Sequence, residues 1–299
     1  MDLGLGDGFR YSIGGALAGR YLASTREVAE VPITVPLNGS APAELSLGKQ
    51  GGTQPNWNSD GSKLVYVAGN SIWLWDPKSG QKRVVVTGGA SPKFSPDGRR
   101  IAYSSGQAIH VVAVEGGRPT PVTKGNRPVW SPDGKSIAFL ENEGVKTYLA
   151  RISLDGQAKP ERVLETASSM PPAWSPDGKW IAVSVMEGLA LVSPDGKSKR
   201  VLLSRTMENY AAPVFSKDGG TLYLTEGTRL TAIDAASAKE RTVAEYPELR
   251  LITQTMNANS PGLSADGKSL ITTSLKIESA IYLIEDLQPP KTLLQEWFR

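Results

Sequence analysis

The chain has 299 residues, a formal net charge of +3, one histidine and no cysteine. The lack of cysteine excludes disulfides and thiolate metal sites, and the small net charge argues against the large basic footprint of a nucleic-acid-binding protein. No stretch approaches the roughly 18 consecutive apolar residues of a membrane-spanning helix, so we expect no membrane insertion. The opening residues, MDLGLGDGFRYS, lack the charged-then-apolar layout of a signal peptide.

Residues 1–50 predict strands that are related to segments found later in the chain. The stretch GRYLAS begins at Gly19 and matches GRRIAYS, which begins at Gly98, and VPITVPL follows it at residues 31–37. Gly19 also lies 42 residues before Gly61, which is within the range of the spacings between the later repeats. We therefore interpret these 50 residues as a degenerate copy of the repeated unit.

From Pro55 onward the motif Pro-x-aromatic-Ser-x-Asp-Gly occurs six times. Asn58 replaces the serine in the first copy and Leu263 replaces the aromatic residue in the last. Successive motif glycines are 37, 36, 44, 41 and 48 residues apart, and they are Gly61, Gly98, Gly134, Gly178, Gly219 and Gly267. A period near 40 residues with this turn chemistry is typical of the four-stranded blades of a β-propeller.

Each unit contains the segments that such a blade needs. Apolar runs such as Leu64–Ala68 follow the Asp-Gly turn and predict strands buried on both faces, while later runs such as KRVVVT are more polar and predict outer strands. We predict an all-β fold, a β-propeller of four-stranded antiparallel blades forming one domain over residues 1–299. Seven blades fit best, with residues 1–50 as the first and residues 51–290 as six clear repeats; six blades are the alternative if residues 1–50 only close the ring.

Ring closure requires a strand that leaves no exposed edge. FRYSIG near the N-terminus and KTLLQEWF near the C-terminus are the candidates for it, so residues 291–299 are expected to be a tail or a closing strand.

The repeats resemble those of the TolB-like (WD40-like Pro-Asp repeat) β-propeller family, as in PVWSPDGKSIAF at residues 128–139. The resemblance covers about residues 53–290. It implies a bacterial, periplasmic or extracytoplasmic protein whose propeller face binds another protein, although the chain shows no signal peptide. The last unit, with ESAIYLIEDL, is similar to the end of propellers found in larger bacterial signalling proteins. Residues 1–50 are too short for the α/β domain that precedes the propeller in TolB.

Catalysis is not supported by the residue types present. The sequence has no Gly-x-Ser-x-Gly elbow, and its single histidine, His110, lies in a predicted strand. The motif aspartates are expected to form turns, and Glu208 is the only acid in the segments that lead into the inner strands. We therefore predict a non-enzymatic protein with no catalytic residues, no metal and no cofactor.

The loops that enter the inner strands meet at one mouth of a propeller's channel, where a rigid scaffold can present them to a partner. We predict a monomeric scaffold that binds a protein or peptide there. Tyr210 and Arg127 are the strongest candidates, because tyrosine and arginine are enriched at binding hot spots. The full set of candidate residues is Gln54, Ser91, Asn126, Arg127, Met170, Tyr210 and Asn257.

The alternative is a propeller associated with hydrolysis. It would be a carboxylate-dependent glycosidase or lactonase, or the substrate-gating propeller of a prolyl-oligopeptidase-type peptidase. Two acidic residues converging in the channel would favour a glycosidase, whereas an uncharged channel with an apolar rim would favour binding.

Overall fold

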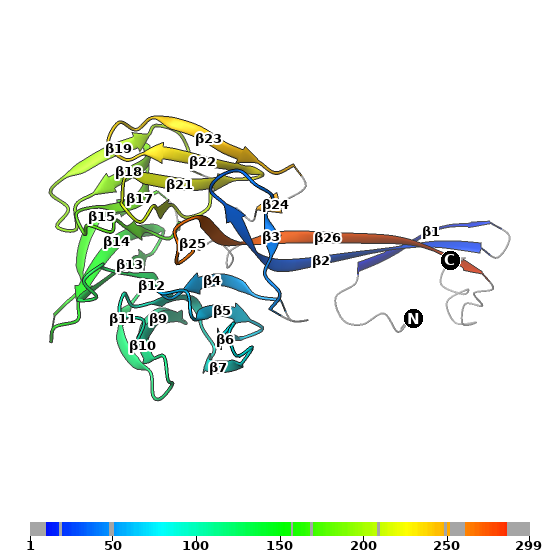
Figure 1. Cartoon of the computed structure of the whole chain (residues 1–299), viewed down its shortest axis with the longest axis horizontal. Coiled ribbons are helices and arrows are strands. Elements are labelled where there is room, and N and C mark those ends of the chain that lie inside the picture. The colour runs from blue at the N-terminus through cyan, green and yellow to red at the C-terminus, as the bar shows by residue number, and fades with distance from the viewer. Residues whose placement is uncertain are drawn as a thin grey trace. The chain divides into compact units, whose positions relative to one another are not determined.

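The computed structural model describes residues 10–17, 20–47, 51–156, 158–167, 170–207, 210–247, 250–251 and 261–285. The regular secondary structure in these ranges consists of β-strands (Figure 1). No helix in the described part of the chain has the length and hydrophobicity needed to cross a lipid bilayer.

Five four-stranded antiparallel sheets follow one another from residue 53 to residue 245, and in each the strands are hydrogen-bonded in chain order. Blade 1 contains β4 (Thr53–Trp57), β5 (Leu64–Ala68), β6 (Ser71–Trp75) and β7 (Lys82–Thr87). Blade 2 contains β8 (Ala90–Phe94), β9 (Arg100–Ser105), β10 (Ala108–Ala113) and β11 (Thr120–Lys124). Blade 3 contains β12 (Asn126–Trp130), β13 (Ser136–Glu143), β14 (Lys146–Ser153) and β15 (Glu161–Thr166). Blade 4 contains β16 (Ala173–Trp174), β17 (Ile181–Val185), β18 (Gly188–Val192) and β19 (Lys199–Leu203). Blade 5 contains β20 (Val214–Phe215), β21 (Thr221–Glu226), β22 (Arg229–Asp234) and β23 (Glu240–Glu245).

Blade 6 is assembled from two distant parts of the chain. Its strands are, in order from the inside, β25 (Gly262–Leu263), β26 (Ser269–Glu285), β2 (Arg20–Pro36) and β3 (Ala43–Glu44); β24 (Arg250–Leu251) also pairs with β26. The Leu37 N–H donates a hydrogen bond of 2.8 Å to the Lys268 carbonyl, which joins the two parts. The inner strand β25 contacts both β20 of blade 5 and β4 of blade 1, which closes the ring.

The propeller therefore has six blades, and the prediction of seven was wrong. Residues 31–36 complete blade 6 because Ile33 and Val35, which are 1% and 0% exposed, pack into one apolar cluster with Leu230 and Leu270. The closing strand is thus not FRYSIG, most of which lies in β1 (Arg10–Leu17) and pairs with residues 20–26 of β2. KTLLQEWF lies outside the described residues.

The chain divides into two compact units. One comprises residues 1–29 and 275–299, and in it β1 forms an antiparallel pair with the first part of β2. The other comprises residues 30–274 and contains the propeller. The cavity described below is lined by residues of the second unit alone.

The Ser-x-Asp-Gly segment of the motif, which is Asn-Ser-Asp-Gly in the first copy, forms the turn that leads from the inner strand to the next. In blade 3 the Asp133 carboxylate accepts hydrogen bonds from the Ser131 hydroxyl at 2.6 Å and from the Lys135 N–H at 3.0 Å. These hydrogen bonds lower the pKa of Asp133 below its ordinary value of 3.8. Gly134 has a φ of +69°, a conformation that suits glycine. As predicted, the motif aspartate belongs to the architecture.

The motif's aromatic residue packs against the preceding blade. Trp130 of blade 3 lies in a cluster with Ala102 and Ile109 of blade 2. Its indole N–H donates to the Lys93 carbonyl at 3.1 Å, and the Arg100 guanidinium lies 4.7 Å from its ring centroid. The repeated aromatic residue therefore joins neighbouring blades.

Candidate functional site

The inner strands of all six blades surround a central cavity of about 410 Å³. This volume falls in the range of roughly 300–1,000 Å³ that is usual for ligand pockets. Each blade contributes the residue between the proline and the aromatic residue of its motif, and these six are Asn56, Lys93, Val129, Ala173, Val214 and Gly262. The repeated architecture thus brings one variable position per blade into the wall of the channel.

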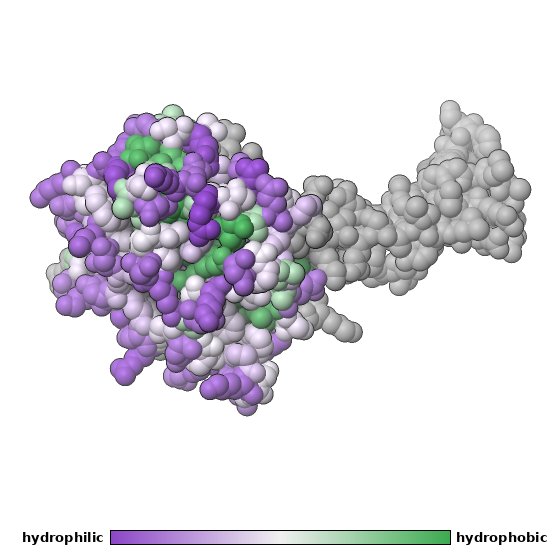
Figure 2. All heavy atoms as spheres, turned by 45° about the horizontal axis from the view of Figure 1, so that its top comes forward, coloured by the Kyte–Doolittle hydropathy of each residue, from purple (hydrophilic) through white to green (hydrophobic). Residues whose placement is uncertain are grey.

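The wall of this cavity is largely apolar. Its prolines are Pro96, Pro171, Pro172, Pro176, Pro213 and Pro261, and its aromatic residues are Trp57, Phe94, Trp130, Trp174 and Phe215. Lys93 and Lys217 are the charged residues, and no aspartate or glutamate of the described chain lines the cavity. Figure 2 shows apolar residues near the middle of the face that it presents, with hydrophilic residues around them.

Asn56 is held in place between three blades. Its Oδ1 accepts a hydrogen bond of 2.9 Å from the Phe94 N–H of blade 2. A Cβ atom added to Gly262 of blade 6 would lie 3.3 Å from its Nδ2. Asn56 therefore supplies a polar group at a fixed position in the cavity wall.

Lys93 is the half-buried one of the two lysines that line the cavity. Its Nζ lies 3.5 Å from the Pro261 carbonyl oxygen, so the side chain of blade 2 reaches a backbone acceptor of blade 6. Burial lowers the pKa of the Lys93 ammonium to about 8, and no described carboxylate forms an ion pair with it. The cavity therefore holds a desolvated positive charge with only a long hydrogen bond to a carbonyl.

This charge predicts a pH-dependent cost in stability. At pH 7 we expect Lys93→Met to raise the free energy of unfolding by roughly 2–3 kcal/mol, because the methionine carries no desolvated charge. Between pH 8 and 10.5 the native lysine loses its proton before the unfolded lysine does, so the wild type gains stability with rising pH and the difference shrinks. Urea unfolding from pH 6 to 10 measures it. The exposed Lys217→Met is the control, with an expected change within about 0.5 kcal/mol; equal effects of the two substitutions would contradict the argument.

Three predicted binding residues instead shape the starts of the inner strands. Gln54, Ser91 and Arg127 each precede the motif proline and share a φ of +53°, and a register shift interrupts each strand at this point. Gln54 and Ser91 are only 3% and 8% exposed, and the Ser91 N–H donates to the Gln54 side-chain carbonyl. Arg127 is half-buried, its N–H donates to the Ser104 hydroxyl at 3.0 Å, and burial lowers the pKa of its guanidinium.

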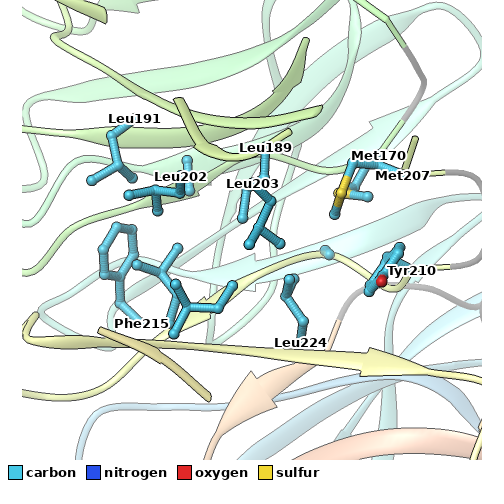
Figure 3. Packing of buried hydrophobic residues seen from close by; sticks show 13 residues of the cluster. Met170, Leu189, Leu191, Leu202, Leu203, Met207, Tyr210, Phe215 and Leu224 are labelled. Atoms are coloured by element: carbon cyan, nitrogen blue, oxygen red, sulfur yellow. The ribbon is translucent and has the colours of Figure 1, made fainter. Parts of the chain in front are cut away.

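Met170 and Tyr210 lie in the apolar cluster between blades 4 and 5 (Figure 3). They are 7% and 6% exposed, and the Tyr210 hydroxyl accepts a hydrogen bond of 2.8 Å from Arg205 Nε. Arg205 in turn forms a bidentate ion pair with Glu240. The interior position of these two side chains leaves a partner little surface, so substituting Tyr210 would test packing more than binding.

None of the six described candidates lines the cavity. They lie where the inner strands begin, whereas the cavity extends along these strands to their other ends, where Ser59, Pro96 and Lys217 of the Asp-Gly turns line it. Asn126 is half-buried in β12, while Asn257 and Glu208 lie outside the described residues. A binding role for each of the seven candidates stays a prediction.

The residues that line the channel, Asn56 and Lys93 above all, were missed by the sequence reasoning. The available signal was the variable position inside an otherwise regular motif, which carries Asn, Lys, Val, Ala, Val and Gly in the six copies.

His110 lies in β10, where its ring stacks on Tyr103 with 5.5 Å between the centroids. Its Nδ1 is buried without a hydrogen-bond partner. In the ranges that the structure covers, no group of three or more His, Cys, Asp or Glu residues could hold a metal ion.

Comparison with known proteins identifies the family to which this propeller belongs. A family model described as the TolB beta propeller domain matches residues 34–245, and a search of curated proteins finds no match. A protein assigned as TolB from Agrobacterium tumefaciens is similar in structure, with a TM-score of 0.68, 20% identity and coverage of 84% of this chain and 99% of that one. TolB from Acinetobacter baumannii gives a TM-score of 0.55 and 18% identity over 90% and 68% of the two chains. An oligogalacturonate lyase in complex with manganese gives 0.53 and 12% over 96% and 98%. These structural similarities show a shared fold, and the match over most of the propeller shows that the chain belongs to the TolB beta-propeller domain family.

Proposed function

We propose that this chain is a non-enzymatic binding propeller whose central channel receives a segment of a protein partner. The observation that carries the proposal is the composition of the cavity wall, which all six blades build from prolines, aromatic residues and small aliphatic residues without a described carboxylate. Such a wall can desolvate an inserted side chain, and well-packed desolvated pockets are where binding energy concentrates. A glycosidase would instead need two carboxylates at this place.

A substitution that fills the channel tests the proposal. Val129 lines the cavity in blade 3, and Val145, at the tip of the β13–β14 hairpin of the same blade, is fully exposed. We expect peptides selected from a display library on the wild-type protein to bind Val129→Phe at least tenfold more weakly, because the phenyl ring occupies the volume that the ligand needs. The matched control Val145→Phe should bind them as the wild type does. Isothermal titration calorimetry measures the affinities.

Overpacking at Val129 can cost about 1–3 kcal/mol of stability, so thermal unfolding must show that the variant is folded at the temperature of the binding experiment. Selected peptides that bind both variants like the wild type would place binding elsewhere on the propeller. A library that yields no binder to the wild type would contradict the proposal itself.

A further inference from the structure

Lys93 is the charged residue among the variable positions of the channel wall, and a charge there can select a ligand of opposite charge. Five of the six variable wall positions carry neutral residues, and Lys93 alone carries a charge there. The other lining cation, Lys217, is exposed and donates a hydrogen bond to the Ala265 carbonyl at the channel's end. The cavity therefore contains one inward cation in an apolar surrounding.

An ammonium group in such a surrounding is costly unless an anion pairs with it. The contact of 3.5 Å from Lys93 Nζ to the Pro261 carbonyl is at the outer limit of a hydrogen bond. A carboxylate brought into the channel would compensate the charge, and the attraction between the two groups is stronger in an apolar cavity than in water. No carboxylate of the described wall competes for this position.

Resting on the proposed function, we propose that the channel is selective for a ligand that carries a carboxylate, and that this carboxylate pairs with Lys93 Nζ. The ligand of the channel is then an acidic side chain of the inserted segment, Glu or Asp, held by the ammonium of blade 2 among the prolines and aromatic rings of the other blades. Asn56, which is fixed beside Lys93 in blade 1, provides an amide that can donate to the second oxygen.

The described carboxylates nearest the channel are engaged elsewhere and do not pair with Lys93. The turn aspartates each accept a backbone N–H from the residue two positions later, and they are Asp60, Asp97, Asp133, Asp177, Asp218 and Asp266. The titratable residues on strands that contact β8 are Tyr66, Arg100, Tyr103 and Arg127. Burial raises the pKa values of Tyr66 and Tyr103 above their ordinary value of 10, so both hydroxyls keep their protons between pH 6 and 9. A change of carboxylate binding in this pH range therefore reports on Lys93.

The test compares two hexapeptide libraries that are identical except for Glu or Gln at one fixed position. On the wild-type protein we expect the Glu library to bind at least tenfold more tightly. Lys93→Met should abolish the difference, and Lys93→Arg should retain most of it. The control Lys135→Met should leave it unchanged, because Lys135 is exposed and does not line the cavity. The preference for Glu should decline as the pH rises through 8. The indoles of Trp57, Trp130 and Trp174 line the cavity and supply a fluorescence signal.

Two small carboxylates distinguish the possible sources of the group. Glutarate and galacturonate are titrated into the wild type and Lys93→Met, with glutaramide as the neutral control. If they bind in a Lys93-dependent manner while neither library binds, the carboxylate site stands and the proposed protein-binding function fails. If peptides bind and are lost in Val129→Phe, but Glu and Gln bind equally or Lys93→Met binds like the wild type, the proposed function stands and the carboxylate assignment is overturned. No binding of any probe overturns both.

Discussion

Replacing Gly188 with alanine should lower the free energy of unfolding by more than about 3 kcal/mol. Gly188 begins β18 in blade 4 with a φ of +135°, a conformation that alanine strongly disfavours. An added Cβ would overlap the Leu203 carbonyl oxygen and lie 2.8 Å from that of Arg205. These are backbone atoms beside the cluster between blades 4 and 5, so they cannot move aside without disturbing the packing there.

Gly144 provides a matched control, because it occupies the corresponding turn of blade 3. Its φ is +60°, and an added Cβ would have no atom within 4 Å. Gly144→Ala therefore incurs only the conformational penalty of roughly 1–2 kcal/mol. Urea unfolding followed by circular dichroism measures both variants. Equal losses would mean that the close approach at Gly188 does not constrain blade 4.

Closure of the ring predicts a second large effect. Ile33→Ala should destabilise the protein by about 2–5 kcal/mol, as expected for a fully buried isoleucine, and Ile33→Val by only about 0.5–1.5 kcal/mol. Ile33 packs in one cluster with Leu270, although the two residues lie at opposite ends of the propeller sequence. The double variant Ile33→Ala, Leu270→Ala should therefore show a coupling energy of about 0.5–3 kcal/mol.

A pair that shares no cluster serves as the control for this cycle. Ile137 is equally buried but belongs to a cluster between blades 2 and 3, so Ile137→Ala and Ile33→Ala should be additive within about 0.5 kcal/mol. Denaturant titrations of the single and double variants give the required free energies. Additivity of Ile33 and Leu270 would contradict closure through blade 6.

The strands and turns of each blade could be predicted from the sequence, because the residues that form them lie close together in the chain. The Asp-Gly turns, the buried strands after them and the aromatic residue that packs on the preceding blade are all set within about 40 residues. The number of blades depended on residues 31–36, whose pattern fits a strand in any blade. The pairing of β2 with β26 and the apolar cluster that Ile33 shares with Leu270 assign that strand to blade 6, and no periodicity contains this information.

The site was harder to predict for the same reason. Tyr210 was favoured because tyrosine is common at interfaces, but it is 6% exposed and fills the space between two blades. Packing between neighbouring blades decides whether such a residue faces a partner or the core, and amino-acid composition carries no information on that packing. Lys93 was identifiable in principle, since it is the only charged residue at the variable position of the six motifs.

Because blade 6 combines strands from both ends of the propeller sequence, it can form only after the last repeat has been synthesised. Residues 37–268 separate the end of β2 from the start of β26, so a ribosome that adds about 5–20 residues per second needs on the order of 10–50 s to deliver the partner strand. During this interval Ile33 and Val35 have no completed blade to enter, and an apolar strand with an open edge is available for mispairing. We therefore expect a chaperone to bind β2 of the growing chain and to dissociate when the last repeat emerges from the ribosome.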